Sequence, residues 1–423
     1  MTDSGILALH NQDLVDVMVE ADRCGSPYAL ILHDLAEHGY AYPLDEEELG
    51  PLRQKGKAFE GSIWNSPILT EFTSPKIEPD TNQVKETLLN DIAGDDVYSF
   101  APSHGSRSED ALAISNLINN IDNPRYNKSG FVSSLHSPEL ERIYQYTPDW
   151  DQDGILGMSR LTIEVTPADS TQDIEFSDSY MHSTLVTGSK IWLVFRPTSN
   201  NMAVLQAYYD TVLNGTENHA LDHARNFEPG IIFIQRPGET LLLPPFWMAT
   251  VVSVQPTVSA TFYIATAIEF EERVKQLRNF RSTMRLHLVD DREAQRMLFT
   301  FTDELIEHLR AILEGSFPEC DLNKVISNIC RDYETFRADL RRLLGAIEDR
   351  AVVQGLEAKY QAAWINFLEM KRKKTRKPTC RVCNLRIEYM PVGTSPMDRL
   401  RQHFIEFHCL RSVRSIERIR IAR

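Results

Sequence analysis

Cysteine is scarce in this sequence, and long apolar runs are missing. Six cysteines are spread over 423 residues, which argues against a disulfide-stabilised scaffold and indicates a reducing compartment. The most apolar stretch, residues 240–254, is interrupted by Pro244 and Pro245 and is too short to span a bilayer. The first residues are mixed and acidic, without the basic segment and apolar run of a secretory signal. We therefore expect a globular protein of two to three domains with no membrane contact.

Positive charge is also sparse, except in one region. The net charge is −15, yet residues 371–423 hold 15 Lys and Arg against 4 Asp and Glu, a balance of +11. The other 370 residues have a balance of −26. An acidic body with a basic segment indicates that any nucleic-acid contact is made by that segment. The alternative is a solvated segment that only keeps the chain in solution.

Residue patterns divide the chain into four regions. Residues 1–83 contain one helical pattern, over 12–36, and Pro-containing loops. Residues 84–268 hold short β-rich runs bounded by Pro, Gly, Asn or Asp, which predicts a β-sandwich or barrel. Residues 269–370 change to helical periodicity, and residues 371–423 form a basic segment with a zinc-finger-like motif. The predicted strands are 97–100, 161–165, 190–195, 230–234, 240–243, 249–254 and 259–265.

Several motifs of the β-rich region follow one another in a recognisable order. STQDIE, residues 170–175, aligns without a gap with the motif T-D-F-H-x-D, and residues 188–190 then supply its G-x-K. RPGETLLLP, residues 236–244, and PPFWMATV, residues 244–251, follow the strand motifs P-G-D/E-x-x-x-x-P and P-x-G-W-I-H-A-V. Over about residues 84–280 the chain resembles the JmjC domain of iron- and 2-oxoglutarate-dependent oxygenases. The branch it is most similar to is the histone lysine demethylases that carry F-box or PHD-finger modules.

The resemblance implies a specific fold. A JmjC domain is a double-stranded β-helix, also called a cupin-like jelly roll. The whole chain is therefore expected to be α+β: this β domain, an N-terminal helical segment, a C-terminal helical extension and a small zinc finger. Trp192 and Trp247 match aromatic positions of the family and are expected in the core.

The resemblance also marks the iron-ligand positions, and this sequence departs from them. Asp173 and Glu175 stand where the family has His and Asp, and Ala249 stands where it has the last His. Alternate residues of a strand point to the same face, so the first two keep the geometry. However, carboxylates suit Mg, Ca or Mn better than iron, and alanine offers no ligand. We expect the iron site to be lost, and oxygenase activity with it.

Lys190 aligns with the lysine that binds the distal carboxylate of 2-oxoglutarate in the family. Retained cosubstrate binding is one expectation. The other is an ion pair between Lys190 and Asp173 or Glu175 inside a barrel without iron, because buried carboxylates require partners.

Other histidines offer little replacement for the missing ligands. A shifted register would place Tyr180 and His182 at the first two positions, still without a His-x-Asp pair. His219 and His223 are four residues apart and could share a helix face and bind a metal. Two exposed loop histidines would show the same spacing.

Residues 380–408 carry a zinc-ligand pattern. Cys380-x2-Cys383 is followed by 19 residues and His403-x4-His408, which resembles a C2H2 zinc finger with a long spacer. Two thiolates and two imidazoles give closed tetrahedral coordination, so a bound zinc should be structural. Cys409 could replace His408 as the fourth ligand. Ser395-Pro396 predicts the start of the helix that carries the histidines.

The run before this motif is strongly basic and is typical of a nuclear localisation signal. It comprises Lys371, Arg372, Lys373, Lys374, Arg376 and Lys377. Arginines of the finger could add phosphate contacts, namely Arg399, Arg401, Arg411, Arg414, Arg418 and Arg420. A single finger contacts roughly three base pairs, so any DNA binding should be weak and mostly independent of sequence.

These inferences predict a nuclear, catalytically inactive JmjC-like protein with structural zinc, while iron and 2-oxoglutarate are doubtful. Its expected partners are chromatin proteins or histone tails, with weak DNA contact through the basic segment. One alternative is an active 2-oxoglutarate-dependent oxygenase with relocated iron ligands. Another is a zinc-finger nucleic-acid-binding protein whose β domain is structural.

Overall fold

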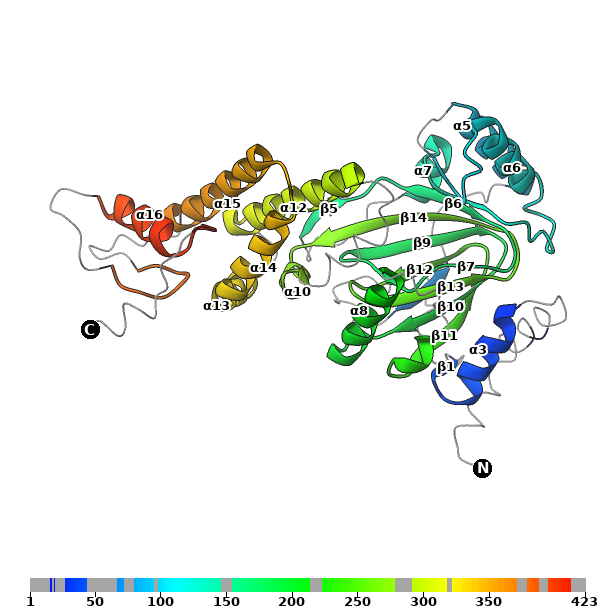
Figure 1. Cartoon of the computed structure of the whole chain (residues 1–423), viewed down its shortest axis with the longest axis horizontal. Coiled ribbons are helices and arrows are strands. Elements are labelled where there is room, and N and C mark those ends of the chain that lie inside the picture. The colour runs from blue at the N-terminus through cyan, green and yellow to red at the C-terminus, as the bar shows by residue number, and fades with distance from the viewer. Residues whose placement is uncertain are drawn as a thin grey trace. The chain divides into compact units, whose positions relative to one another are not determined.

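The computed structural model describes residues 27–43, 67–71, 80–94, 98–145, 154–213, 223–277, 291–317, 322–370, 379–387 and 395–411, together with Asp16 and Val19. These residues form eleven α-helices and fourteen strands, so the expected mixed α+β class is confirmed (Figure 1). The chain separates into two compact units. The first is Met1–Trp150 with Gly157–Ala265, and the second is Asp151–Leu156 with Thr266–Arg423. The four-region division of the sequence stays a prediction.

The first sheet has six strands. Their order is β1 (Ala41–Pro43), β11 (Gly230–Gln235), β10 (Lys190–Phe195), β13 (Met248–Ser253) and β7 (Ser170–Thr171), with β8 (Glu175–Phe176) also paired to β13. β1 runs parallel to β11, and the other pairs are antiparallel.

The second sheet has eight strands. Their order is β2 (Ile68–Glu71), β12 (Glu239–Leu243), β9 (Tyr180–Thr187), β14 (Thr257–Thr266), β6 (Thr162–Thr166), β4 (Phe131–Leu135) and β3 (Ser99–Ala101), and β5 (Ile155–Met158) pairs with β14. The pairs along the main path are antiparallel.

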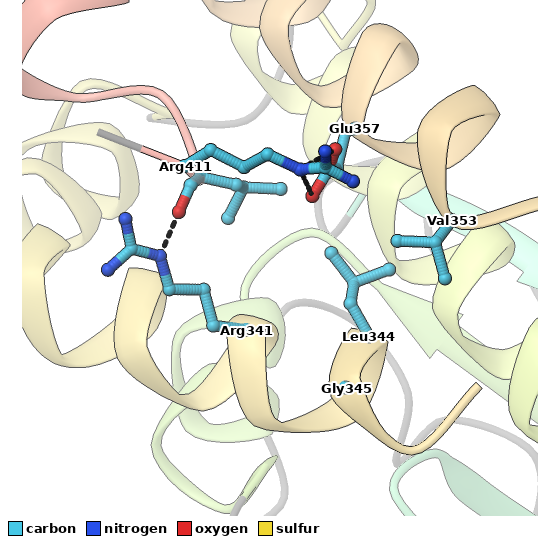
Figure 2. Close-up of a pocket in the computed structure, with 7 residues that line it drawn as sticks. Arg341, Leu344, Gly345, Val353, Glu357 and Arg411 are labelled. Atoms are coloured by element: carbon cyan, nitrogen blue, oxygen red, sulfur yellow. Dashed lines mark hydrogen bonds and ion pairs between the residues drawn. The ribbon is translucent and has the colours of Figure 1, made fainter. Parts of the chain in front are cut away.

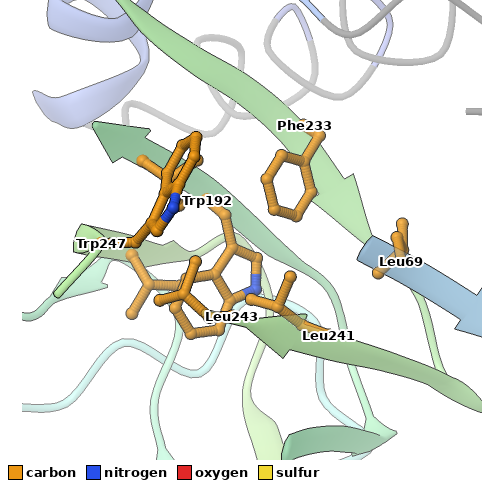
Figure 3. Packing of buried hydrophobic residues seen from close by; sticks show 8 residues of the cluster. Leu69, Trp192, Phe233, Leu241, Leu243 and Trp247 are labelled. Atoms are coloured by element: carbon orange, nitrogen blue, oxygen red, sulfur yellow. The ribbon is translucent and has the colours of Figure 1, made fainter. Parts of the chain in front are cut away.

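One apolar cluster joins the two sheets. It contains Trp192 and Val194 of β10 and Phe233 of β11 from the first sheet, together with Leu241 and Leu243 of β12 from the second (Figure 3). Leu69, Trp247 and Val251 complete it. The two sheets therefore share a core, and both tryptophans lie in it, as the sequence predicts.

A two-residue turn carries the chain from the second sheet to the first. β9 ends at Thr187 and β10 begins at Lys190. Gly188 has a φ of 81°, and a Cβ at this position would lie 2.2 Å from the carbonyl oxygen of Pro256. Only glycine accommodates both the positive φ and this close approach.

Helices account for the rest of both units. The first unit contains α3 (Pro27–Glu37), α5 (Thr81–Gly94), α6 (Arg107–Asn119), α7 (Pro138–Tyr144), α8 (Ser199–Leu213) and the short 3-10 helix η1 (Ala224–Asn226). The second contains α10 (Phe270–Lys275), α12 (Asp291–Glu314), α13 (Leu322–Arg331), α14 (Tyr333–Gly345), α15 (Arg350–Met370) and α16 (Pro396–Phe407). Among the described helices, none combines the length and the apolar character needed to cross a membrane.

Serine side chains begin three of these helices. Ser106, Ser137 and Ser395 each accept a hydrogen bond from the backbone N–H three residues later, which satisfies one of the unpaired donors of a first helical turn. Ser395-Pro396 therefore starts a helix as predicted. Of the predicted helical pattern over residues 12–36, residues 12–15, 17–18 and 20–26 lie outside the described part.

Candidate functional site

The structure brings the three positions aligned with iron ligands to one place. Glu175 of β8 lies directly across from Ala249 of β13 in the strand register. Asp173 and Glu175 are exposed, while Ile174 between them is buried. This alternation is the one that the i, i+2 spacing predicts. Ala249 packs against the shared apolar core and offers only a methyl group.

Two tyrosines accompany the carboxylates. Tyr208 of α8 donates its hydroxyl hydrogen to Asp173 Oδ1 at 3.0 Å. Burial and the charge of Asp173 raise the pKa of Tyr208 well above its ordinary value. Burial, with the charges of Glu175 and Glu164, also raises the pKa of Tyr263 on β14. The Tyr208 phenol is thus a hydrogen-bond donor to the Asp173 carboxylate.

Lys190 is paired with a residue that the sequence analysis did not select. Its Nζ lies 3.2 Å from Oε2 of Glu164, and the lysine is only 1% exposed. Lys190 belongs to β10 and Glu164 to β6, so the pair bridges the two sheets. The other oxygen of Glu164 accepts a hydrogen bond from Gln172 Nε2. The pairing of Lys190 with Asp173 or Glu175 that we considered is therefore replaced by a pairing with Glu164.

This arrangement favours neither iron nor an anionic cosubstrate. The positions aligned with iron ligands offer two exposed carboxylates and a methyl group, and the ammonium group of Lys190 is already paired with Glu164. A facial iron site requires two imidazoles and a carboxylate. Within the described residues, Asp173 and Glu175 do not belong to any group of three or more His, Cys, Asp or Glu side chains placed to hold a metal.

Of the histidines considered as replacement ligands, His182 is buried against an aromatic ring, whereas His223 lies beside Tyr208, the tyrosine that binds Asp173. His182 is 1% exposed and stacks on Phe262 with ring centroids 4.8 Å apart. His223 lies beside the ring of Tyr208, with centroids 4.8 Å apart. His219 is outside the described residues, so the His219–His223 pair stays a prediction.

A group of four side chains in the second unit could hold a metal ion such as zinc. Its members are Cys380, Cys383, His403 and His408, whose ligand atoms all lie within 4.8 Å of one another. His403 Nε2 lies 3.1 Å from His408 Nε2 and 3.3 Å from Cys383 Sγ. Tetrahedral zinc, with bonds of about 2.0 Å to nitrogen and 2.3 Å to sulfur, places such atoms roughly 3.3 to 3.6 Å apart. The donor set therefore fits the ion in both chemistry and separation.

Local structure explains how these ligands meet. Cys380 and Cys383 lie on a tight turn in which Cys380 N donates to Leu385 O at 2.9 Å. His403 lies on α16 and His408 at its C-terminal end, and both are buried. Hydrogen bonds with Cys380, His403 and His408 lower the pKa of the Cys383 thiol, and the bond with Cys380 has the largest effect. A thiolate is the form that binds metal.

Cys409, considered as an alternative fourth ligand, is not part of this group. Its Sγ contacts the carbonyl oxygen of Ile405 at 3.0 Å. His408 instead directs Nε2 toward His403. A zinc held by Cys380, Cys383, His403 and His408 would cross-link the turn and the helix, and a site closed by four protein ligands has no position for a substrate.

Helix α16 is packed into the helical unit. Its Phe404 is fully buried and lies against Trp364 of α15, with ring centroids 6.3 Å apart. Tyr333 of α14 contacts Phe404 and His408 edge-on. The ligand-bearing helix is thus one element of a common aromatic core.

A stripe of donors on α14 binds the main chain at the end of α16. Tyr333 donates to the carbonyl oxygen of His408, and Tyr360 donates to the Tyr333 hydroxyl at 2.7 Å. Arg337 Nη1 donates to Phe407 O at 2.6 Å, and Arg341 Nε donates to Leu410 O. These bonds satisfy carbonyls that a helix leaves unpaired at its end, which fixes the ligand helix to α14.

Two of the arginines considered for phosphate contact have acidic partners. Arg401 binds Glu369 of α15, with Nε 2.7 Å from Oε1. Arg411 binds Glu357, with Nε 2.7 Å from Oε2 and 2.8 Å from Oε1. Arg414, Arg418, Arg420 and the basic run Lys371–Lys377 lie outside the described residues.

The comparison with known proteins adds no further identification. No protein-family model matches the chain, and no curated protein matches its sequence. The fold and the site therefore define an α+β protein with a Cys2His2 group that could hold a metal.

Proposed function

We propose that this protein is a JmjC-like pseudo-oxygenase, in which the fold of an oxygenase is kept without its chemistry. Its β domain would then be a double-stranded β-helix. Two mainly antiparallel sheets with a shared core support it, as does the adjacency of β8 and β13, which carry Glu175 and Ala249.

The observation that carries the proposal is the ion pair between Lys190 and Glu164. The lysine of JmjC oxygenases that aligns with Lys190 binds a carboxylate of 2-oxoglutarate. In this protein the carboxylate of Glu164 already lies 3.2 Å from Lys190 Nζ. With no donor at Ala249, both the metal and the cosubstrate lose their main contacts.

The proposed role is regulatory contact with chromatin proteins or histone tails in the nucleus. The zinc-held helical unit would supply a rigid surface, and the basic run Lys371–Lys377 would supply nuclear import and weak DNA contact. The ion pairs of Arg401 and Arg411 with α15 favour protein contact over phosphate contact for α16. A zinc-finger nucleic-acid reader would require this helix to enter a groove.

The test measures metal content and turnover of the full chain. Elemental analysis should give about one zinc and no stoichiometric iron, since the Cys2His2 group is the closed N/S ligand set. Incubation with Fe(II) and 2-oxoglutarate should release no succinate. Near-stoichiometric iron that is lost in Asp173→Ala or Glu175→Ala would overturn the proposal and support an active oxygenase with relocated ligands.

A variant that restores the iron ligands of the family tests the alignment itself. The triple variant Asp173→His, Glu175→Asp, Ala249→His should bind Fe(II) measurably, because the strand register pairs residues 175 and 249 and residue 173 lies two positions before 175. Affinity should be poor, since neighbouring groups do not orient the new ligands. A folded triple variant without any gain in Fe(II) binding would mean that the alignment is wrong.

A further inference from the structure

The metal ligand His408 lies at the end of α16, where its own helix holds it from one side. Its backbone N–H donates to Phe404 O at 2.7 Å. Its carbonyl oxygen, in contrast, is one of the acceptors that a helix end leaves without an intrahelical donor. The residue is fully buried, and a buried carbonyl oxygen needs a donor from another element. The position of this ligand is therefore set partly from outside α16.

The imidazole ring of His408 is oriented by packing. Its Nε2 lies 3.1 Å from Nε2 of His403. Metal-binding histidines typically donate the other ring N–H to a carboxylate or carbonyl oxygen, which fixes the ring. Among the described residues, none accepts a hydrogen bond from His408 Nδ1. The ring instead lies against Tyr333 and Phe404, with centroids 5.5 and 5.9 Å apart.

Tyr333 of α14 contacts both the ring and the main chain of His408. Its own ring is edge-on to the imidazole, with an interplanar angle of 88°, and its hydroxyl donates to the His408 carbonyl oxygen. A phenol has a single hydrogen, so Tyr333 accepts the 2.7 Å bond that joins it to Tyr360 of α15. Both tyrosines are buried. Their hydroxyls form a relay from α15 to the ligand, and the bonds of such a chain strengthen one another.

The residues that follow His408 are attached to the same two helices. Figure 2 shows that Arg341 of α14 binds the carbonyl oxygen of Leu410. In the same view, Arg411 pairs with Glu357 of α15. Helices α14 and α15 both precede the Cys-x2-Cys and His-x4-His motif in the sequence. The surroundings of this ligand thus come from outside the motif that supplies it.

We propose that Tyr333 and Tyr360 are positioning residues of the metal centre. Their relay holds His408 where it can complete the coordination, so the affinity for zinc depends on α14 and α15. In an isolated zinc finger the metal itself has to organise its ligands, whereas a ligand placed in advance lowers the cost of ordering on binding. The relay lies within the second unit and does not depend on whether the β domain is a pseudo-oxygenase.

The experiment measures the zinc affinity of the full chain by competition with a chromophoric chelator. Tyr333→Phe keeps the ring and removes only the hydroxyl. It should weaken zinc binding by at least about tenfold, the lower end of the losses seen when outer partners of metal ligands are removed. Unchanged affinity in a folded Tyr333→Phe protein would overturn the proposal, as would a wild type that binds no zinc.

Tyr209→Phe is the matched control. Tyr209 is also buried, and its hydroxyl donates to a carbonyl oxygen, that of Ile174 at 2.9 Å, in the first unit. Both variants lose one buried hydrogen bond, so both should lower the melting temperature of the metal-free protein. Only Tyr333→Phe should weaken zinc binding. An equal loss of zinc affinity in both variants would attribute it to general destabilisation and refute the positioning role.

Two double-mutant cycles test the order of the relay. The effect of Tyr333→Phe on zinc affinity should disappear when His408 is replaced by Ala, because the tyrosine acts through this ligand. Tyr360→Phe should cause a smaller loss than Tyr333→Phe, and this loss should disappear when Tyr333 is already Phe. Additive losses in the first cycle would show that Tyr333 does not act through His408, and additive losses in the second would exclude the relay.

Discussion

His182 is a histidine that the β domain keeps uncharged, and acid should therefore destabilise the protein through it. The residue lies on β9, with Leu242 of β12 and Phe262 of β14 as its cross-strand partners. It is 1% exposed, and burial lowers its pKa from 6.5 to about 3. An imidazolium ion at this position would have to lose its hydration among apolar neighbours.

The size of the effect follows from the difference between the folded and unfolded pKa values. Between pH 6.5 and pH 3 the unfolded chain binds one more proton at His182 than the folded chain, so the free energy of unfolding falls as the pH falls. Each pH unit in this window costs about 1.4 kcal/mol, which amounts to about 2 kcal/mol at pH 5 relative to neutral pH. That is a large share of the 5–15 kcal/mol typical of a folded domain.

The assay is urea unfolding of the full chain and of His182→Leu at pH 7.5 and pH 5.0. The loss of stability on acidification should be about 2 kcal/mol smaller in the variant, because groups that titrate elsewhere contribute equally to both proteins. His33→Gln, which removes an exposed histidine whose side-chain accessibility is 66%, is the matched control. An identical pH response of the wild type and His182→Leu would refute the reasoning.

Three further predictions concern the turn, the buried ion pair and the metal. Gly188→Ala should destabilise the protein by about 2 kcal/mol or more in urea unfolding, since its Cβ would clash with Pro256; a neutral effect would contradict the turn geometry. Glu164→Gln should cost about 3 kcal/mol because it leaves the Lys190 charge buried without its carboxylate, whereas adding Lys190→Met should recover most of this loss; additive losses in this double-mutant cycle would argue against a direct pair. Cys383→Ser, or zinc removal, should reduce helical circular dichroism and lower the melting temperature of the second unit; an unchanged melting curve would mean that the ion does not stabilise this unit.

Half of the described strands could be predicted from the sequence, because β-branched runs bounded by turn residues mark seven of the fourteen. Strand β9 was missed although it lies in the second sheet between β12 and β14. Its buried positions include Ser183 and Thr184, which satisfy their hydroxyl groups across the sheet with Thr261 at 2.9 Å and Thr240 at 2.8 Å. Hydroxyl pairs of this kind hide the apolar alternation on which strand prediction relies.

Helices α6 and α8, inside the β-rich region, were also missed. Helix α6 carries a readable signal, since Ser106 and Glu109 have the spacing of a capping box and Ser106 Oγ accepts a hydrogen bond from Glu109 N. Helix α8 is capped by Thr198, whose Oγ1 accepts a hydrogen bond from Asn201 N, but it lacks the Glu or Gln of a capping box and begins with the polar run Ser199-Asn200-Asn201. Its importance lies in Tyr208, whose contact with Asp173 is set by tertiary packing that local sequence does not encode.

The two candidate sites differ in how far sequence reasoning could reach. The Cys2His2 group follows from short-range spacing and a helix cap, so all four members were selected. The partner of Lys190 depends on the registers of strands in two different sheets, and nothing near residue 190 points to residue 164. A glutamate within the otherwise β-rich run Leu161–Val165 was the available clue, because a charged residue in a buried strand requires a partner.

The donor stripe of α14 has a consequence for how this protein can change over time. Tyr333, Arg337 and Arg341 bind carbonyl oxygens, which every residue supplies whatever its side chain. The bonds from the stripe to residues 407–410 therefore survive changes of side chain in that segment, whereas they do not survive changes in the stripe itself. Distant relatives of this helical unit should keep an aromatic residue and two arginines at intervals of four residues, upstream of the cysteine pair. This pattern should persist even where the residues corresponding to 407–410 differ.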